Sequence, residues 1–151
     1  MKPLCKDDLE KLITDNMETG YFTGGIEKKL VDKIEEDLDI LLPNSYKHFL
    51  MKYGSGGIFG VDILGAGKTD QPFVVTETEK YRQKGLEKDL VLIEDCDEFL
   101  YCLDTSEMVN EECPVVSWDQ HEGIDSIESA NFCKFLLERF IDSKEAWEED
   151  F

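Results

Sequence analysis

Two histidines, His48 and His121, could serve as a histidine base for acid–base or nucleophilic catalysis in this 151-residue chain. His48 lies on the polar side of a predicted helix, where we expect it to face solvent. His121 lies in Asp-Gln-His-Glu-Gly, a loop after a predicted strand, and Cys113 or a serine is a candidate nucleophile for it. A lone histidine is a weak signal of catalysis. We therefore expect no catalytic residue. A small enzyme that uses the His121 loop remains the least favoured of three hypotheses; the other two are given at the end of this section.

Nucleotide binding is suggested by the segment Gly-Ala-Gly-Lys-Thr at residues 65–69. A phosphate-binding P-loop needs a further glycine five residues before Gly67, and Asp62 occupies that position. An aspartate directed into a phosphate cradle repels the ligand, and Pro72 follows soon after, where a P-loop leads into a hydrophobic helix. We expect a glycine loop at the end of a strand, and no nucleotide or other cofactor.

Metal binding through thiolates requires closer spacing than this chain offers. Its five cysteines include Cys96, Cys102 and Cys113, with five and ten residues between them and no Cys-x-x-Cys pair. A zinc site or a disulfide framework needs a more regular arrangement. We expect reduced, mostly buried thiols, because cysteine is among the most buried residue types.

Carboxylates form a second kind of candidate site. Asp95, Asp97 and Glu98 surround a predicted hairpin turn. Such a cluster can bind calcium or supply an acid–base pair. The calcium-loop pattern, with its glycine and terminal glutamate, is absent, so we expect no metal. We expect these acids to lie on an exposed edge, either as a guard against aggregation or as part of a partner surface.

The charge of the chain is distributed unevenly. The net charge is −19, and residues 94–151 hold 18 acidic residues against three basic ones. No lysine or arginine occurs between Lys88 and Lys134. Contacts to phosphate need basic residues, so we expect no direct binding of nucleic acid or of an anionic membrane. A field of this size steers a basic protein partner and speeds its association.

The length and composition predict one domain over residues 1–151. A hydrophobic content of 41% and an aromatic content of 11% are enough for a core. No apolar run approaches the ~20 residues needed to cross a bilayer. The N-terminal residues lack the apolar core of a signal peptide, and we expect a cytoplasmic protein.

The element that organises the chain is a helix predicted over residues 43–53, because four apolar residues repeat at i, i+3, i+4 and i+7: Tyr46, Phe49, Leu50 and Tyr53. Gly54 supplies the left-handed residue that ends such a helix. Gly56 and Gly57 then predict a tight turn into a strand over residues 58–64. We expect Gly57 to adopt a backbone conformation that a side chain does not readily take.

Four further helices are predicted over about residues 7–19, 26–39 and 76–85, and from Asp125 toward the C-terminus. The last one rests on the capping-box spacing of Asp125 and Glu128 and on an apolar face that includes Phe132, Phe135, Leu136 and Phe140.

Three closely spaced strands are predicted at 90–93, 99–103 and 115–118, which favours an antiparallel meander. The fold class is therefore α+β, with a mainly antiparallel sheet packed by N-terminal and C-terminal helices.

Ordered segments also carry a family resemblance: Leu42-Pro43-x-x-Tyr46-x-x-Phe49-Leu50, Tyr53-Gly54-x-Gly56-Gly57, Cys102-Leu103-Asp104-Thr105, Glu112-Cys113-Pro114-Val115-Val116-x-Trp118-Asp119 and Ser126-Ile127-x-Ser129-Ala130-x-Phe132. Together they lie within about residues 25–142, and the chain resembles the SUKH superfamily, which includes the Smi/Knr cell-wall regulators. Within it, the chain is most similar to YobK-like immunity proteins of Gram-positive bacteria. The resemblance implies a toxin-neutralising binding protein, not an enzyme.

The first hypothesis joins this resemblance to the charge. An immunity protein binds a cognate polymorphic toxin, and a nuclease toxin needs a basic groove that an acidic surface can occupy. We expect the partner to contact six residues: Asp95, Asp97, Glu98, Trp118, Asp119 and Glu122. They form two groups that need not lie together, because alternate connections of a meander emerge at opposite edges. The second hypothesis is an intracellular protein-binding adaptor of the Smi/Knr type.

Overall fold

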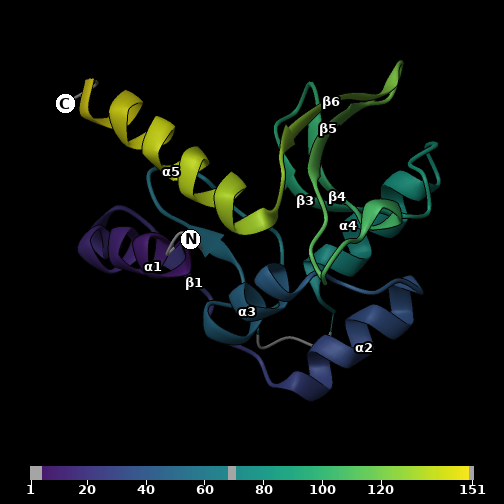
Figure 1. Ribbon diagram of the computed structural model, residues 1–151, viewed down its shortest axis with the longest axis horizontal. Coiled ribbons are helices and arrows are strands. Elements are labelled where there is room, and N and C mark those ends of the chain that lie inside the picture. Colours follow the sequence, from purple (N-terminus) through teal and green to yellow (C-terminus); the bar gives the residue numbers. More distant parts are fainter. Residues whose placement is uncertain (1–4, 68–70, 150–151) are drawn as a thin grey trace.

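The computed structural model describes residues 5–67 and 71–149 (Figure 1). The helices are α1 (Cys5–Asp15), α2 (Lys28–Leu38), α3 (Asn44–Lys52), α4 (Phe73–Arg82) and α5 (Phe132–Glu149). The strands are β1 (Tyr21–Phe22), β2 (Gly56–Gly57), β3 (Leu90–Asp95), β4 (Leu100–Asp104), β5 (Val115–Asp119) and β6 (Gly123–Ser129). Single turns of 3-10 helix, η1 (Met17–Thr19) and η2 (Thr105–Glu107), complete the order. The fold is α+β, as predicted.

Helix α3 lies at the centre of the core. The predicted stripe is confirmed for three of its four residues: Tyr46, Phe49 and Leu50 are each at most 2% exposed, whereas Tyr53 caps the helix end and is half-buried. The Phe132 ring at the start of α5 meets both aromatic rings of this stripe edge-on, at centroid distances of 5.1 Å to Tyr46 and 5.6 Å to Phe49. Gly54 has φ +81° and follows the helix end, as its position predicted. An apolar stripe at helical spacing was therefore enough to locate the central helix.

The predicted strand over residues 58–64 is wrong. Gly56 and Gly57 pair as β2 against β1, and within residues 58–64 only Ile63 pairs, in an isolated antiparallel bridge to Gly56. The rest of that segment runs through the core as a loop that buries Ile58 and Val61. The expectation for Gly57 needs the same correction, since the positive φ of 113° falls on Gly56. Gly57 is required for space instead, because a Cβ there would lie 2.1 Å from the carbonyl oxygen of Val61.

The main sheet is an antiparallel meander in the order β3-β4-β5-β6. Its fourth strand corrects the predicted start of the last helix, because the segment with the capping-box spacing, residues 123–129, pairs with β5. The helix begins at Phe132 instead, where the Asn131 side-chain oxygen accepts a hydrogen bond from the Lys134 amide at 2.9 Å. Helix α4 likewise begins at Phe73, earlier than predicted, directly after Pro72.

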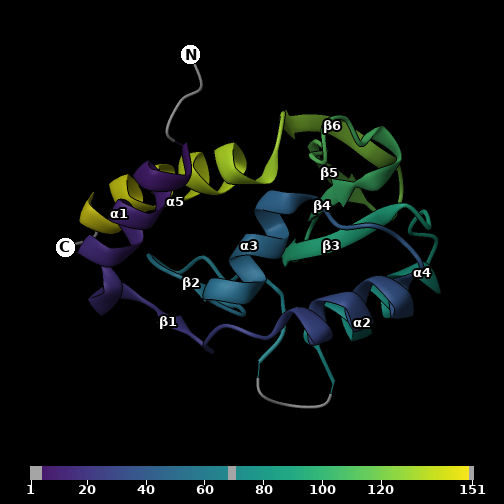
Figure 2. The same cartoon turned by 60° about the horizontal axis from the view of Figure 1, so that its bottom comes forward.

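Helices cover the sheet on both faces (Figure 2). Val91, Ile93, Leu103 and Val115 belong to the larger core, which also contains the buried residues of α1, α2, α3 and α5. The opposite face packs against α4 and the loop after it, through a smaller cluster: Leu86, Leu90, Leu92, Leu100, Cys102, Val116 and Trp118. Strand β6 is the edge strand on the side away from β3, and most of its residues are exposed.

Helix α1 packs along α5, and a disulfide between Cys5 and Cys133 joins the two. The prediction of reduced thiols is wrong for this pair. The two cysteines have a sequence separation of 128, and only the packing of the helices brings them together. Cys102 and Cys113 are free and buried, as predicted. Burial, together with nearby carboxylates, raises the pKa of the Cys113 thiol to about 12.

Residues 68–70, which include part of the predicted glycine loop, lie outside the described residues. Among the helices of residues 5–67 and 71–149, none combines the length and the apolar character that crossing a membrane requires.

Candidate partner-binding site

The meander brings both predicted groups of acidic residues to one end of the sheet. The β3–β4 turn and the β5–β6 turn are the first and third connections, and alternate connections of a meander return to the same end. The expectation that the two groups emerge at opposite edges is therefore wrong. Asp97 and Glu98 of the first group and Asp119 of the second line a groove of about 400 Å³, whose full lining is Tyr81, Asp97, Glu98, Phe99, Leu100, Trp118, Asp119, Gln120 and His121. We call these two turns and their groove the hairpin end.

Two of the predicted acids hold the turns in shape. Asp95 Oδ1 accepts a hydrogen bond from the Asp97 amide at 2.9 Å. Asp119 Oδ1 accepts from the amides of His121 and Glu122, both at 2.8 Å. An aspartate that bonds the backbone two residues ahead is a common way to stabilise a tight turn. Asp95 and Asp119 therefore position the other acids, whatever contacts they make with a partner.

The other three predicted acids are exposed and available. Within the described part of the chain, the carboxylates of Asp97, Glu98 and Glu122 make no hydrogen bond or ion pair. Asp97 has φ +70°, a conformation that aspartate and asparagine tolerate better than most residues. These three carboxylates are the part of the hairpin end best suited to attract a basic partner.

Trp118 belongs to the floor of the groove. Its side chain is only 2% exposed, and its indole N–H donates to Glu87 Oε1 at 2.8 Å. The ring meets Tyr81 edge-on at a centroid distance of 6.4 Å. A partner group that enters the groove meets a rigid aromatic surface there. A partner that touches only the two turns does not reach the indole.

Tyr81 is a groove residue that the sequence analysis missed. Its hydroxyl donates to Asp95 Oδ2 at 3.4 Å, and burial followed by the charge of Asp95 raises the pKa of Tyr81. Lys80 and Lys84 lie over its ring at 5.7 and 5.0 Å, so basic residues border the groove on its α4 side. No local pattern marks Tyr81, because its position depends on how α4 packs against the sheet.

The family model SUKH_5, described as SMI1-KNR4 cell-wall, matches residues 5–141. The chain belongs to the SUKH family. The match runs from α1 into α5, so it includes both turns of the hairpin end. It confirms the resemblance to the SUKH superfamily and supports protein binding as the general role of this SUKH protein.

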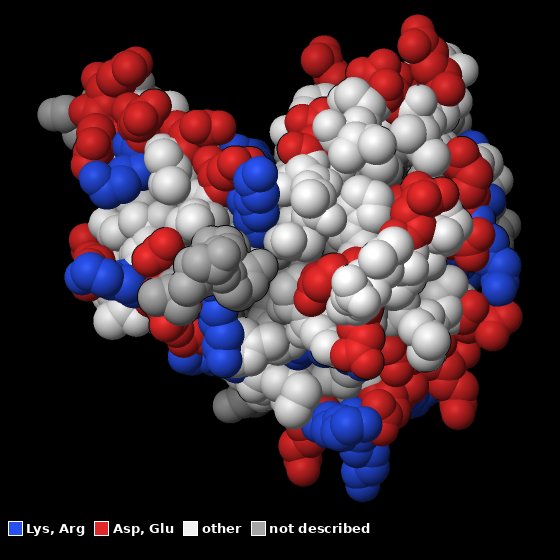
Figure 3. Space-filling view, viewed as in Figure 1, with Lys and Arg blue, Asp and Glu red and all other residues white. Residues whose placement is uncertain are grey.

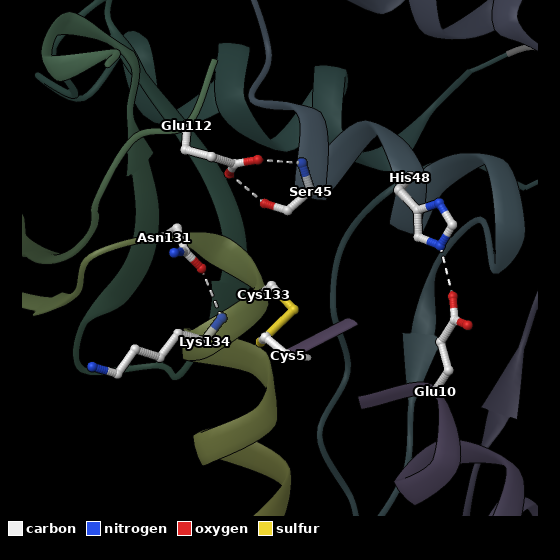
Figure 4. Close-up of a disulfide and its surroundings, with 8 residues drawn as sticks. All are labelled: Cys5, Glu10, Ser45, His48, Glu112, Asn131, Cys133 and Lys134. Carbon is white, nitrogen blue, oxygen red and sulfur yellow. Dashed lines mark hydrogen bonds and ion pairs between the residues drawn. A yellow bond between two sulfur atoms is a disulfide. The ribbon is translucent and has the colours of Figure 1, made fainter. Parts of the chain in front are cut away.

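A second group of polar residues in the SUKH protein lies between α1 and α3, beside the disulfide (Figure 4). His48 Nε2 lies 2.7 Å from Glu10 Oε2, so His48 does not simply face solvent as predicted. The Ser45 amide and hydroxyl both donate to Glu112, at 2.9 and 2.6 Å. These residues line a pocket of about 310 Å³, but their polar groups are already paired with one another.

The Cys113–His121 pair considered for catalysis is separated in the SUKH protein. Cys113 precedes β5 and is 1% exposed, whereas His121 follows β5 on an exposed turn. The five residues of the strand stand between them, and a nucleophile must lie within hydrogen-bond reach of its base. The fold therefore keeps this thiol away from this imidazole.

Proposed function

We propose that this SUKH protein is a cytoplasmic immunity protein of the YobK-like kind, which binds and neutralises a cognate polymorphic toxin and is not an enzyme. The observation that carries the proposal is the hairpin end, where the unpaired carboxylates of Asp97 and Glu98 line a groove with an aromatic floor and that of Glu122 lies in the adjoining β5–β6 turn. Family membership supports protein binding, and the hairpin end supports a basic partner.

A nuclease toxin fits this surface well, because its own groove must be basic to hold nucleic-acid phosphates. Carboxylates at the hairpin end would draw that groove in and would occupy the positions of the phosphates. Charges at the rim of an interface act mainly on the rate of association, whereas the buried centre sets the rate of dissociation. We therefore assign steering to Asp97, Glu98 and Glu122, and anchoring to the groove floor at Tyr81 and Trp118.

The test needs a candidate toxin domain, which we would seek among the genes that neighbour the gene for this protein. Asp97→Asn, Glu98→Gln and Glu122→Gln are combined, which removes three charges and leaves the turn-forming Asp95 and Asp119 in place. At low salt, association with the toxin should slow by about tenfold, and its dependence on salt should become shallower.

A matched control removes three exposed carboxylates elsewhere, through Glu18→Gln, Glu36→Gln and Glu107→Gln. This control should associate at nearly the wild-type rate. The proposed surface is wrong if the hairpin variant keeps the wild-type rate and salt dependence.

The description of the matching family favours a second candidate, an intracellular adaptor of the Smi/Knr type that binds other proteins of its own cell. The survival of cells that express the candidate toxin domain distinguishes the two functions. Co-expression of an immunity protein restores survival, whereas co-expression of an adaptor does not.

A further inference from the structure

A second groove lies on the sheet face that looks toward α5. It measures about 230 Å³ and is lined by residues of β5, β6 and the start of β4: Phe99, Tyr101, Ser117, Trp118, Asp119, Asp125 and Glu128. Figures 1 and 3 show α5 and the β5–β6 hairpin diverging to leave a V-shaped hollow, with acidic residues on both arms. We call this second groove the sheet-face groove.

Aromatic rings form the floor of the sheet-face groove. Phe99 meets Tyr101 edge-on at a centroid distance of 5.1 Å, and Tyr101 in turn packs on Phe135 of α5 at 4.9 Å. Both Phe99 and Tyr101 remain partly exposed. Because Phe135 is buried, it fixes the ring of Tyr101, and the floor is a preformed apolar surface.

Two irregularities in β6 place carboxylates at the rim of this floor. The pairing with β5 passes from Ile124 to Ser126 and from Ile127 to Ser129, which leaves Asp125 and Glu128 as the extra residues. A bulge of this kind redirects the side chain of the extra residue. Both carboxylates line the sheet-face groove, and Asp125 makes no hydrogen bond or ion pair within the described part of the chain.

The protein already places one guanidinium group on this floor. Arg139 of α5 lies 5.8 Å from the centroid of Tyr101 and pairs through two nitrogens with Glu94, at 3.0 and 2.7 Å. Glu94 is 5% exposed, so its charge is neutralised inside the protein by Arg139. The sheet-face groove presents the same combination, an aromatic ring and carboxylates, to whatever binds from outside.

We propose that the sheet-face groove receives an arginine side chain of the basic partner, an inference that rests on the proposed function for the identity of that partner. A planar guanidinium stacks on an aromatic ring and donates in parallel to carboxylates, as Asp125 and Glu128 allow. A lysine offers a compact charge without the flat surface or the fork of donors. The groove therefore selects arginine over lysine.

The direct test is an NMR titration of the ¹⁵N-labelled full chain with N-acetyl-arginine amide, compared with the lysine and citrulline amides. Arginine amide should shift the backbone signals of Tyr101, Ser117 and Glu128 along a saturating curve. The combined Asp125→Asn and Glu128→Gln variant should weaken this binding by at least about fivefold, as expected for the loss of charge-assisted hydrogen bonds. A Glu36→Gln and Glu107→Gln control should bind as the wild type does. Equal, diffuse shifts with all three amides would overturn the proposal.

A second measurement uses the toxin domain and separates this inference from the proposed function. The Asp125→Asn and Glu128→Gln variant should bind the toxin at least about tenfold more weakly than the wild type. If its amide spectrum is otherwise unchanged, this loss supports the groove as an arginine site of the complex. If that variant binds the toxin normally while the hairpin variant associates slowly, the proposed function stands and the groove inference fails. If the wild type does not bind the toxin but still binds arginine amide, the arginine site stands and the toxin is not its source.

Discussion

Single carboxylates at the hairpin end differ in what they do, although they look alike in the sequence. Asp95 and Asp119 accept backbone hydrogen bonds and shape the turns, whereas Asp97, Glu98 and Glu122 have free carboxylates. Substitution of the first two changes the backbone as well as the charge. Substitution of the other three changes the charge alone, which makes them the informative positions for binding experiments.

Phe49 is expected to be among the most sensitive residues of the core. Its ring is 2% exposed and lies between Phe22, Tyr53 and Phe132. Phe49→Ala should lower the free energy of unfolding by about 3–5 kcal/mol, the usual cost of removing a buried phenylalanine. Urea denaturation measures this change, with the exposed Met51→Ala on the same helix as the control. A loss below about 1 kcal/mol would mean that Phe49 does not pack as described.

Glu10 should give the protein part of its stability at neutral pH. Burial raises the pKa of its carboxyl, but hydrogen bonds and charges from His48 and Lys52 outweigh burial, and the net pKa lies below the ordinary value of 4.5. The unfolded chain therefore binds a proton at higher pH than the folded one does, and the contribution is lost as pH falls below 4.5. Thermal unfolding of wild type and Glu10→Gln should show a gap in Tm at pH 7 that narrows by pH 3. A gap that is constant with pH would contradict the pairing.

At the scale of elements, strand β2 and the loop that follows it depend on close approach of their backbone segments. A Cβ on Gly57 would lie 2.1 Å from the Val61 carbonyl oxygen, a contact that only a backbone shift can relieve. Gly57→Ala should therefore cost about 1–3 kcal/mol, the range for overpacking. The control is Gly67→Ala, where the nearest atom lies 3.4 Å away. Equal midpoints of denaturation for the two variants would show that the loop moves aside freely.

Helix α3 and the strands β3, β4 and β5, which have strong local signals, were predicted well, whereas strand β6, which only pairing identifies, was not. Helix α3 could be predicted from its apolar stripe and from Gly54, because both signals are local in the sequence. Strand β6 was assigned to a helix because the spacing of Asp125 and Glu128 fits a capping box as well as a bulged strand, and only pairing with β5 decides between them. The shared end of the two turns follows from the order of strands, but the separate roles of their acids depend on side-chain geometry.

At the scale of the whole molecule, the charge and the covalent structure lie in different places. The acidic turns are carried by the meander, whereas the Cys5–Cys133 disulfide holds α1 to α5. The acidic turns of the hairpin end and the disulfide therefore lie on different parts of the fold. No spacing of cysteines signals this bond, since it depends on packing between helices at opposite ends of the chain.

The disulfide should stabilise the oxidised protein mainly by restricting its unfolded chain. A combined Cys5→Ser and Cys133→Ser variant should lose about 2–4 kcal/mol relative to the oxidised wild type. In the presence of dithiothreitol, wild type and variant should unfold at nearly the same denaturant concentration. A difference that persists under reduction would assign the effect to packing of the two side chains.

The same bond has a consequence for where the protein is found in the cell. With a sequence separation of 128 between its two cysteines, it turns most of the polypeptide into a closed ring. A denatured ring is more compact than the open chain and migrates faster in electrophoresis without reductant. If cells are treated with a thiol-blocking reagent before lysis, the mobility of the protein in a non-reducing gel therefore shows whether it was in an oxidising compartment. The cytoplasmic location proposed above requires the slower, open form, because thiols are kept reduced there.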